Sequence, residues 1–400
     1  MCNNRCVFCV SGQRTGLGEA KPLPLGPIVE RVRVARAAGH SKITLLGGEP
    51  TLQPAFLEVV RECVRLAFEE IVIFTNGAKT ARAALIDEIL ETGGRFSWRI
   101  SIQGGTERAH ERTTRKDGSF GRIVRTLEAL HARGERITIN MCVVGSNYES
   151  VDQFPELLAR HGVSQLHLDL ARPLDAGVRT EEELRAMMPR LSEMVPAFAR
   201  MVAGFPPGFD VNLGNVPYCV APELAEWIHH DGEQTDTIAV DGSDELSRPW
   251  NKYLVKRRGK LKPDSCRGCA YDAQCSGVFD EYARFHGTTE LVPVGALIIG
   301  RSVRARLLRL RSRAPFGALR WESVGISDEG RRAQVVLSGP SGERAVIWLA
   351  EEGRRATGGY TVEGDVTPAL RDGLRAALHA LGAETAGDDE PDRATDRAAP

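Results

Sequence analysis

The sequence predicts an α/β protein built around a parallel sheet. Short apolar runs alternate with segments of helical periodicity through the first half of the chain, which is the pattern of repeated strand–helix units. Three of the apolar runs also alternate residue by residue, so that one face of each strand is polar. A chain of 400 residues is long enough for two or three domains with a substantial core.

The composition is that of an ordinary globular protein. Hydrophobic residues make up 42% and charged residues 26%, and the net charge is -1, so the protein should not be attracted as a whole to nucleic acid or to acidic membranes. No apolar run approaches the thickness of a bilayer, and the N-terminus lacks a basic segment followed by an apolar one. We therefore expect no membrane partner, little affinity for nucleic acid and a cytoplasmic location.

Nine cysteines, mostly in two groups, argue against a secreted disulfide framework and for metal ligation in a reducing compartment. The first group is Cys2, Cys6 and Cys9, spaced so that a tight loop can turn all three sulfurs toward one point. Thiolates select iron–sulfur clusters, zinc or copper(I). A [4Fe-4S] cluster normally takes four protein ligands, so three would leave one iron open. From the spacing alone, a structural zinc site is the alternative.

The helices are expected from their apolar stripes and their end signals. Pro27 can open the first helix because its missing N–H is tolerated in the first turn, and Gly39 ends it. Thr180 and Glu183 have the spacing of a capping box at the start of a long helix that runs toward Met201. Further helices are expected over about 54–68, 85–90, 119–133 and 150–161.

The strands are expected at the short apolar runs between these helices. They cover 43–46, 71–74, 98–103, 137–142 and 166–170, and 209–213 leads out of the series. The first strand runs directly into Gly47, Gly48, Glu49 and Pro50. Two glycines let the backbone approach a ligand closely, and Glu49 adds a carboxylate beside them, although such a motif on its own is usually a turn.

Three consecutive strands have a polar face. The polar residues are Arg99, Ser101 and Gln103 on the first, Thr138, Asn140 and Cys142 on the second, and His167 and Asp169 on the third. Fully buried parallel strands are normally apolar on both faces. The sequence therefore predicts a hydrated barrel interior filled by a ligand. The alternative for any single one of these polar side chains is a hydrogen bond to a neighbouring residue.

Cys2, Cys6, Phe8 and Cys9 match the pattern C-x3-C-x-aromatic-C, and here the sequence resembles the radical SAM enzymes. The resemblance implies that the three cysteines hold a [4Fe-4S] cluster whose open iron chelates S-adenosylmethionine (SAM). One electron then cleaves SAM, and the 5'-deoxyadenosyl radical takes a hydrogen atom from the substrate. It also implies an open, TIM-like (β/α)6 partial barrel over 1–215. Because the cluster loop of this family follows a first barrel strand, that strand is expected to be missing here.

The same resemblance implies roles for residues on the polar faces and in the loops. The Gly47 to Pro50 segment resembles the one that binds the amino group of SAM, Ser101 matches a position near the sulfonium and ribose, and Asn140 matches the next strand's polar position. Phe8 and Gln103 complete the cofactor-binding set. His167 and Asp169 are candidates for binding substrate or for moving a proton once a radical has formed. His110, in the loop after the strand over 98–103, is expected at the surface.

The second group comprises Cys219, Cys266, Cys269 and Cys275, a complete ligand set that suits zinc or a [4Fe-4S] cluster by its chemistry. The C-x2-C-x5-C spacing, with one earlier cysteine and a barrel upstream, resembles the auxiliary-cluster domain called SPASM in its full form and twitch in its short form. Since no cysteine follows Cys275, one auxiliary cluster of twitch type is expected within 216–294. In the family such clusters accept an electron from the substrate radical or coordinate the substrate, and four protein ligands favour electron transfer.

The rest of the chain shows no family pattern. Residues 295–314 alternate arginines with apolar residues, which is more typical of a solvated amphipathic linker helix than of an RNA-binding one. A small α+β accessory module is expected over 315–382, with strands near 319–326, 332–337 and 344–349 and a helix over about 368–381. It would serve as a docking device or as inert packing. The polar tail, 383–400, is expected to be disordered.

The sequence thus predicts a radical SAM oxidoreductase of the maturase type, supplied with electrons by a reductant such as flavodoxin or ferredoxin. The preferred substrate is a ribosomal peptide or protein that undergoes oxidative modification. Oxidation or rearrangement of a small molecule such as a sugar, nucleoside or amino acid is the alternative. RNA as a substrate is supported only by the arginines of residues 295–314. A non-catalytic zinc or iron–sulfur scaffold is the alternative from another class.

Overall fold

The computed structural model describes most of the chain. The described residues are 1–177, 179–206, 208–230, 235–239, 246–251, 254–255, 257–295, 320–327, 332–338, 343–352, 355–363, 371–372, 374–375 and 383–385. They fall into two compact units, Met1–Pro263 with Ser276–Leu291, and Asp264–Cys275 with Val292–Pro400. This division differs from the expected boundaries at 215 and 294, because most of the expected auxiliary domain belongs to the first unit.

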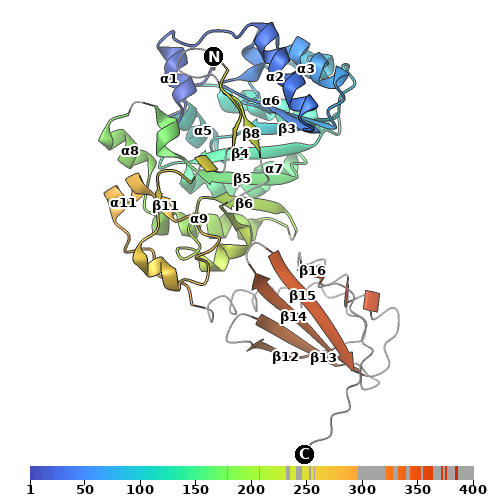
Figure 1. Cartoon of the computed structure of the whole chain (residues 1–400), viewed down its shortest axis with the longest axis vertical. Helices are drawn as coiled ribbons and strands as arrows, with labels where there is room; N and C mark the ends of the chain where they lie inside the picture. The colour runs from blue at the N-terminus through green and yellow to red at the C-terminus, as the bar shows by residue number, and fades with distance from the viewer. Residues whose placement is uncertain are drawn as a thin grey trace, which may run out of the picture. The chain divides into compact units, whose positions relative to one another are not determined.

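The first unit is built on a seven-stranded parallel sheet in sequence order (Figure 1). Its strands are β1 (Lys42–Leu45), β2 (Glu70–Thr75), β3 (Phe96–Ser101), β4 (Ile137–Val143), β5 (Gln165–Leu170), β6 (Asp210–Gly214) and β7 (Ile228–His229). The order runs from β1 to β7 without pairing between the two ends, so the sheet is open. The predicted α/β fold with an open, partial TIM-like barrel is confirmed. β7 was not predicted, because a strand of two residues has no readable periodicity.

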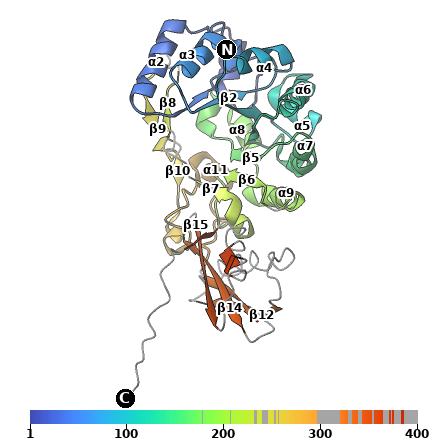
Figure 2. The ribbon, with the colours of Figure 1, turned by 90° about the vertical axis from the view of Figure 1, so that its right-hand side faces the viewer.

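Helices connect the strands and cover the sheet. The longer ones are α2 (Leu25–Ala37), α3 (Phe56–Arg65), α4 (Ala83–Leu90), α6 (Ser119–His131), α7 (Phe154–Arg160) and α9 (Leu191–Gly204). Figure 2 shows α4, α6, α7 and α9 on one side of the strands. On that side the sheet buries Ile71, Ile73, Trp98, Ile100, Ile139 and Leu166, none of them measurably exposed. Burial of each such side chain contributes roughly 1.5–3 kcal/mol, which makes this face the core of the unit.

The expected long helix from Thr180 is wrong in one respect. The capping box of Thr180 and Glu183 is present, but the helix ends as α8 (Glu181–Met187) and restarts as α9. Pro189 lies in the break, where it disfavours helical backbone at the preceding residue. Three short helices were not predicted: α1 (Val10–Gly16), α5 (Glu107–Thr114) and α11 (Asp280–His286).

Short antiparallel pairs follow the barrel. They are β8 (Asp236–Thr237) with β9 (Trp250–Asn251), and β10 (Lys260–Leu261) with β11 (Val278–Phe279). Gly277 precedes β11 at φ +76°, and a Cβ atom there would lie 2.1 Å from the carbonyl oxygen of Leu261. The β10–β11 hairpin therefore requires glycine at this position.

The second unit contains a five-stranded sheet in the order β12 to β16. The strands are β12 (Arg320–Ser327), β13 (Arg332–Ser338), β14 (Arg344–Glu352), β15 (Arg355–Glu363) and β16 (Ala383–Thr385), all antiparallel except β16. The first three were predicted. The last corrects the expectation that disorder begins at 383, since 383–385 pair with β15. The expected linker helix beyond Gly295 and most of the expected helix over 368–381 lie outside the described residues.

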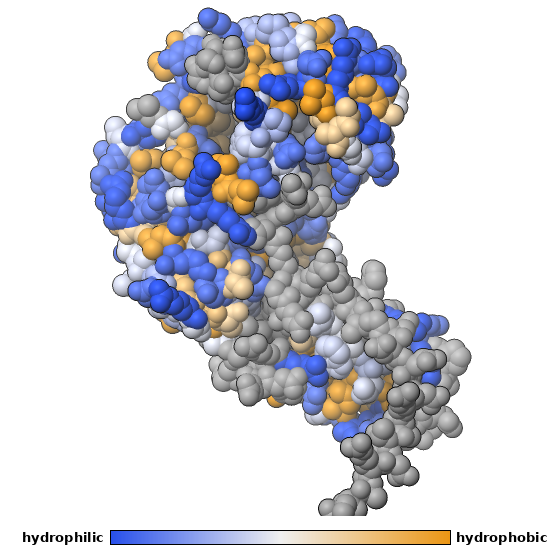
Figure 3. Space-filling model, viewed as in Figure 1, coloured by the Kyte–Doolittle hydropathy of each residue, from blue (hydrophilic) through white to orange (hydrophobic). Residues whose placement is uncertain are grey.

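Within the part of the chain that the structure describes, we find no helix with the length and apolarity needed to cross a bilayer. Figure 3 shows hydrophilic and hydrophobic residues interleaved over the coloured part of the visible face.

Candidate active site

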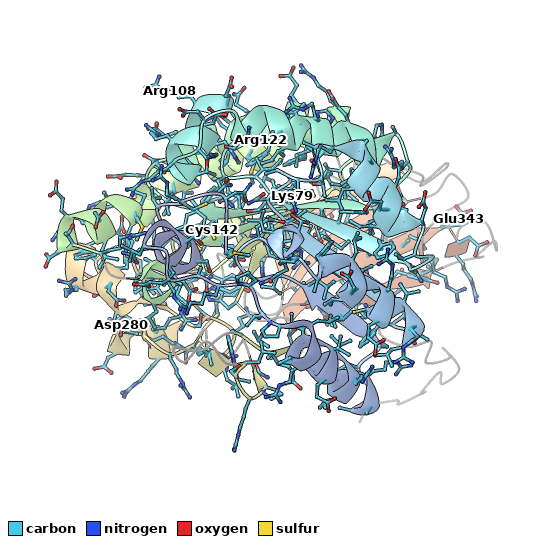
Figure 4. The ribbon with its side chains drawn as sticks, turned by 90° about the horizontal axis from the view of Figure 1, so that it is seen from above. Lys79, Arg108, Arg122, Cys142, Asp280 and Glu343 are labelled. Carbon is cyan, nitrogen blue, oxygen red and sulfur yellow. The ribbon has the colours of Figure 1, made fainter. Side chains whose placement is uncertain are left out.

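Two rows of polar residues cross the sheet of the first unit on the face opposite its apolar core. Register pairing gives the rows Ser101–Asn140–His167–Asn212 and Cys142–Asp169–Gly214–His229. Residues two apart on a strand share a face, so both rows lie on the same face, one step apart. In open α/β sheets, ligands bind outside the carboxyl ends of the strands, and the second row is the one nearer those ends. In Figure 4, Cys142 of this row lies toward the middle of the view, while Arg108 lies at the rim.

Glu49 closes the site at the carboxyl ends of β1 and β2. Its Oε1 accepts hydrogen bonds from Thr51 N–H at 3.2 Å, Thr51 Oγ1 at 2.6 Å and Thr75 Oγ1 at 2.6 Å, and its Oε2 accepts from Asn76 N–H at 2.7 Å. The side chain is only 2% exposed. Burial raises the pKa of Glu49, while the four donors act in the opposite direction. The carboxylate therefore holds the Gly47 to Pro50 loop against the end of β2.

Gly48 in this loop approaches the N-terminus closely. A Cβ atom at Gly48 would lie 2.2 Å from the carbonyl oxygen of Met1, and the N–H of Glu49 donates to that same oxygen at 2.8 Å. Only glycine fits such an approach between two backbones. Pro50 follows at the start of a 3-10 turn (Pro50–Leu52) that Glu49 caps, so the predicted segment forms one rigid loop.

The cysteine loop is anchored on α5. Arg5 N–H donates to Thr114 O at 2.9 Å, and Val7 N–H donates to Thr113 O at 3.0 Å. These two carbonyl groups belong to the last turn of the helix, where backbone acceptors lack intrahelical partners. Phe8 is half-buried. The last carbonyl groups of α5 thus gain hydrogen-bond partners from the loop that carries Cys2, Cys6 and Cys9. In return this helix, which was not predicted, fixes the loop in place.

The thiols of this loop lie close enough to influence one another's ionisation. Burial raises the pKa of Cys6 well above its usual value, and the thiols of Cys9, Cys2 and Cys142 raise it further. Burial also raises the pKa of Cys2, while hydrogen bonds from Asn4 N–H and from the Asn76 side chain favour its thiolate. A positively charged metal centre would reverse the effect of burial, because it stabilises the deprotonated sulfur.

Asn76 links this loop to β2. Its Nδ2 donates to Asn3 Oδ1 at 2.7 Å and lies 3.8 Å from Cys2 Sγ. Lys79, three residues further on, donates from Nζ to Thr51 O at 2.9 Å. The segment Thr75-Asn76-Gly77 follows the strand predicted over 71–74 and was assigned no role from the sequence, yet it contacts both the cysteine loop and Glu49.

Ser101 and Gln103 form a chain with β4. Gln103 Nε2 donates to Ser101 Oγ at 2.6 Å, and its Oε1 accepts from Cys142 N–H at 2.9 Å. Asn147 Nδ2 donates to the carbonyl oxygen of Gln103 at 3.1 Å. Gln103 is 3% exposed. Its side chain therefore holds β3 to β4, and Ser101 and Asn140, both half-buried, are the members of this group that line the open face.

The expectation for His110 was wrong. The ring has no measurable exposure, and its Nδ1 accepts a hydrogen bond from Gln103 N–H at 2.9 Å. Burial lowers the pKa of His110 to about 4, so it is neutral at pH 7, with its proton on Nε2. Its helix, α5, packs inward beneath the loop after β3, a placement that a short helix without a clear stripe does not reveal in sequence.

Asp169 occupies the space that a side chain at position 214 would fill. A Cβ atom on Gly214, its partner on β6, would lie 1.8 Å from Asp169 Oδ1 and 3.5 Å from Cε1 of His229. Glycine at 214 thus leaves room for the carboxylate, and the imidazole lies within reach of the same spot. The rings of His167 and His229 meet edge to face with centroids 6.2 Å apart. The structure therefore groups the predicted His167 and Asp169 and adds His229, which the sequence did not single out.

A chain of hydrogen bonds leads from Asp169 to β10. Asn215 Nδ2 donates to Asp169 Oδ1 at 3.4 Å, and Lys260 Nζ donates to Asn215 Oδ1 at 2.7 Å. Lys260 also donates to Ser276 Oγ at 2.7 Å, which in turn bonds His230 Nδ1 at 2.6 Å. Asn215 adopts the left-handed conformation at φ +67°, which asparagine tolerates better than most residues.

An apolar pocket adjoins this chain. It is lined by side chains from the ends of β4 and β5, from the α8–α9 region and from β11 and α11, among them Leu170, Met187, Met194, Asn215, Phe279 and Tyr282. Methionine side chains adapt to differently shaped partners. The pocket has a free volume of only about 20 Å³, so the methionine side chains would have to move before an apolar part of a ligand could enter. Since Asn215 lines the pocket and also contacts Asp169, such a ligand would bring its polar part to the carboxylate.

The three later cysteines of the second group occupy one turn of the second unit. Cys269 N–H donates to Cys266 O at 2.9 Å, Cys275 N–H donates to Tyr271 O at 2.9 Å, and Val294 N–H lies 3.3 Å from Cys269 Sγ. Cys219 belongs to the first unit. Among the described side chains, no group of three or more His, Cys, Asp or Glu residues is arranged as a metal site. Both ligand sets, Cys2, Cys6 and Cys9 as well as Cys219, Cys266, Cys269 and Cys275, therefore stay predictions.

Comparison with known proteins adds the family. Residues 1–171 match the model of the radical SAM superfamily. This segment is a radical SAM domain. It spans the cysteine loop and β1 to β5, so the predicted family and the prediction of an enzyme are confirmed.

The curated relatives match a little less than half of this chain. GTP 3',8-cyclase from Marinobacter nauticus is 28% identical over 208 residues, which is 49% of this chain and 61% of the relative. A probable GTP 3',8-cyclase from Saccharolobus solfataricus is 29% identical over 178 residues, 44% of this chain and 56% of the relative. The chain thus spans a little over half the length of these relatives.

Solved structures show weaker likeness. SuiB from Streptococcus suis bound to S-adenosylmethionine has a TM-score of 0.48 at 12% identity, covering 74% of each chain. The structure called native anSMEcpe with bound AdoMet has a TM-score of 0.48 at 14% identity, covering 78% of this chain and 96% of the other.

The residues present fit the cluster and SAM that this domain implies. Three thiols on one anchored loop, close enough to influence one another's ionisation, supply the soft donors that an iron–sulfur cluster requires. Asn4 Oδ1 in that loop is buried and has no hydrogen-bond partner among the described residues, which leaves an acceptor beside the thiols. The half-buried Ser101 and Asn140 offer polar groups on the adjoining face.

Four residues of the site were missed in the sequence: Asn76, Asn215, His229 and Lys260. A signal existed for Asn76 and Asn215, since each lies two residues beyond the end of a predicted strand, at the edge where ligands bind. Nothing local marks Lys260 or His229, because long-range packing alone brings them to Asp169.

Proposed function

We propose that this protein is a radical SAM enzyme that oxidises its substrate and delivers the released electron to a second cysteine-held cluster. When bound, SAM and the reduced cluster supply the 5'-deoxyadenosyl radical that removes a hydrogen atom from the substrate. Cys2, Cys6 and Cys9 would ligate that cluster, and a reductant such as flavodoxin or ferredoxin would supply its electron. The observation that carries the proposal is the pair of polar rows across the sheet, beside an anchored loop with three thiols.

The two polar rows would bind SAM at the strands β1 to β4 and the substrate at β5 and β7. Gly47, Gly48, Ser101 and Asn140, with Phe8, lie on or beside the elements β1 to β4 and would hold SAM. Glu49, Pro50 and Gln103 would act by fixing the backbone, since the side chains of Glu49 and Gln103 are already bonded within the chain. His167, Asp169 and His229, on β5 and β7, are left for the substrate.

We assign to Asp169 the role of accepting the proton that the substrate releases. After loss of a hydrogen atom, oxidation of the substrate releases one electron and one proton from the group beside the radical carbon. The carboxylate has room at Gly214, and its position is fixed by the hydrogen bond from Asn215, whose side chain Lys260 holds in turn. Asp169 could therefore accept that proton as a base. The electron would pass to the cluster of Cys219, Cys266, Cys269 and Cys275, whose four thiolates leave no iron open for substrate.

An oxidative change in a ribosomal peptide or protein is our first choice of substrate. The adaptable apolar pocket beside Asn215 suits an apolar side chain, with the backbone or a polar side chain at Asp169. The names of the curated relatives favour the second choice, a nucleotide such as GTP.

The test is an anaerobic assay of reconstituted protein with SAM and a reductant, supplied in parallel with GTP and with any short peptide encoded next to its gene. The proposal expects one of these to raise 5'-deoxyadenosine formation and to yield a product two electrons more oxidised. Asp169→Asn should lower product formed per 5'-deoxyadenosine at least about tenfold. The matched control is Asp210→Asn, an exposed carboxylate at the opposite end of β6, which should leave that ratio unchanged. An equal loss in both variants would remove the role of Asp169. A product formed from GTP without net oxidation would contradict the proposed oxidation and electron transfer, and would replace the first choice of substrate by the second.

A further inference from the structure

Asn76 joins three parts of the site at the end of β2. Its backbone N–H donates to Glu49 Oε2 at 2.7 Å, its side-chain Oδ1 accepts from Ala78 N–H at 3.1 Å, and its Nδ2 donates to Asn3 Oδ1 at 2.7 Å. The same Nδ2 lies 3.8 Å from Cys2 Sγ, within hydrogen-bond range for sulfur. Each contact restrains the amide from a different direction.

The orientation of this amide is determined by its partners. Ala78 N–H can only donate, so the atom facing it must be the oxygen, and the atom facing Asn3 and Cys2 must be the nitrogen. The side chain is 9% exposed, so little water competes for its N–H groups. An NH2 group carries two hydrogens, one for Asn3 Oδ1 and one for the sulfur of Cys2.

We infer that Asn76 raises the reduction potential of the cluster that Cys2 helps to hold, an inference that rests on the proposed function. Reduction adds negative charge to the cluster and its sulfur ligands, and an N–H group aimed at a ligating sulfur stabilises that charge. Asn76 would therefore make the cluster easier to reduce without touching substrate. It acts through Cys2 as a positioning residue.

The test is a redox titration of the reconstituted protein followed by electron paramagnetic resonance, using the signal whose shape changes on addition of SAM. Asn76→Leu keeps most of the volume and removes both polar groups. Asn76→Asp keeps the acceptor for Ala78 N–H but removes the donor and adds a negative charge. In both variants the ratio of reduced to oxidised cluster at a fixed potential should fall, by about three- to tenfold for Leu and by more for Asp. A tenfold change corresponds to about 59 mV for a one-electron couple.

Two further variants make the result specific. Thr80→Val removes a buried hydrogen bond to Thr126, 3.1 Å long, a few residues beyond Asn76, and should leave the potential unchanged. Asn76→Gln keeps an N–H donor and should lie closer to wild type than Leu does. Wild-type potentials in both donorless variants would overturn the inference while the cluster itself, and the proposed function, stand. Loss of iron from Asn76→Leu and Asn76→Asp, with iron retained in Asn76→Gln, would also overturn the inference. Asn76 would then be needed for assembly of the cluster and not for its potential. Absence of the signal from wild-type protein would instead contradict the proposed function.

Discussion

At the residue scale, the site depends on polar groups that the chain itself satisfies. Glu49 is 2% exposed and accepts four hydrogen bonds from Thr51, Thr75 and Asn76. A buried carboxylate is tolerated only with such partners. Its four donors come from the turn that follows Glu49 and from the end of β2, so one side chain fixes the Gly47 to Pro50 loop and the end of β2 relative to each other.

Replacing Glu49 with Gln should therefore destabilise the protein. The amide has one oxygen in place of two, and its NH2 group would face a donor, so at least one buried N–H or O–H loses its acceptor. We expect a loss of about 1–3 kcal/mol in the free energy of unfolding, measured by chemical denaturation. Glu88→Gln, at an exposed position on α4, is the control and should leave the free energy unchanged. Equal stability of Glu49→Gln and wild type would contradict the assigned role.

His110 should make stability depend on pH. Its pKa falls from 6.5 to about 4 in the folded protein because of burial, so the unfolded chain binds more protons between these two values. The free energy of unfolding therefore rises as the pH increases from about 4 to 6.5. The contribution of His110 to stability is lost when the pH falls through the same range. Between pH 7 and pH 5, wild type should lose about 2 kcal/mol more than His110→Gln, whose side chain can still accept from Gln103 N–H. Parallel pH profiles of the two proteins would show that His110 is not buried in its neutral form.

At the element scale, the sheets show how far sequence reasoning reaches. The strands β1 to β6 were predicted because each is an apolar run between helical segments. The polar faces of β3, β4 and β5 predicted Ser101, Asn140, His167 and Asp169 as neighbours on one face, and the register confirms their shared placement. What could not be predicted is set by tertiary packing. Lys260 reaches Asn215 from 45 residues away, and no local pattern encodes that contact.

The sheet of the second unit has an element-scale prediction of its own. Trp348 and Gly359 are direct partners on β14 and β15, and a Cβ atom on Gly359 would lie 2.6 Å from the indole ring. Arg332 lies over the same ring, 4.2 Å from its centroid. Gly359→Ala should displace the indole and lower the free energy of unfolding by about 1 kcal/mol.

The control for this prediction is Gly325→Ala on β12, where an added Cβ atom would meet no other atom within 4 Å. This change should be neutral or slightly stabilising, because alanine restricts the unfolded chain more than glycine does. If Gly359→Ala were as stable as Gly325→Ala, the stacking of Trp348 on the glycine would contribute nothing to the sheet.

At the scale of the whole molecule, the proposed function requires two metal centres. Anaerobically reconstituted protein should contain about eight irons per chain, four for each [4Fe-4S] cluster, and no zinc. Cys6→Ala should remove about four of them, as should Cys269→Ala, and the two losses should add. About four irons with one zinc would keep the SAM-cleaving cluster but remove the electron-accepting role of Cys219, Cys266, Cys269 and Cys275.

The central claim is SAM cleavage at the N-terminal cysteine loop, and the most direct measurement is 5'-deoxyadenosine formed per chain after anaerobic reconstitution, with SAM and a strong reductant. We expect wild type to release it even without substrate, and Cys6→Ala to release none, while Cys63→Ala, at a buried cysteine of α3, releases it as wild type does. Failure of reconstituted wild-type protein to form 5'-deoxyadenosine, or equal formation by Cys6→Ala, would contradict the account.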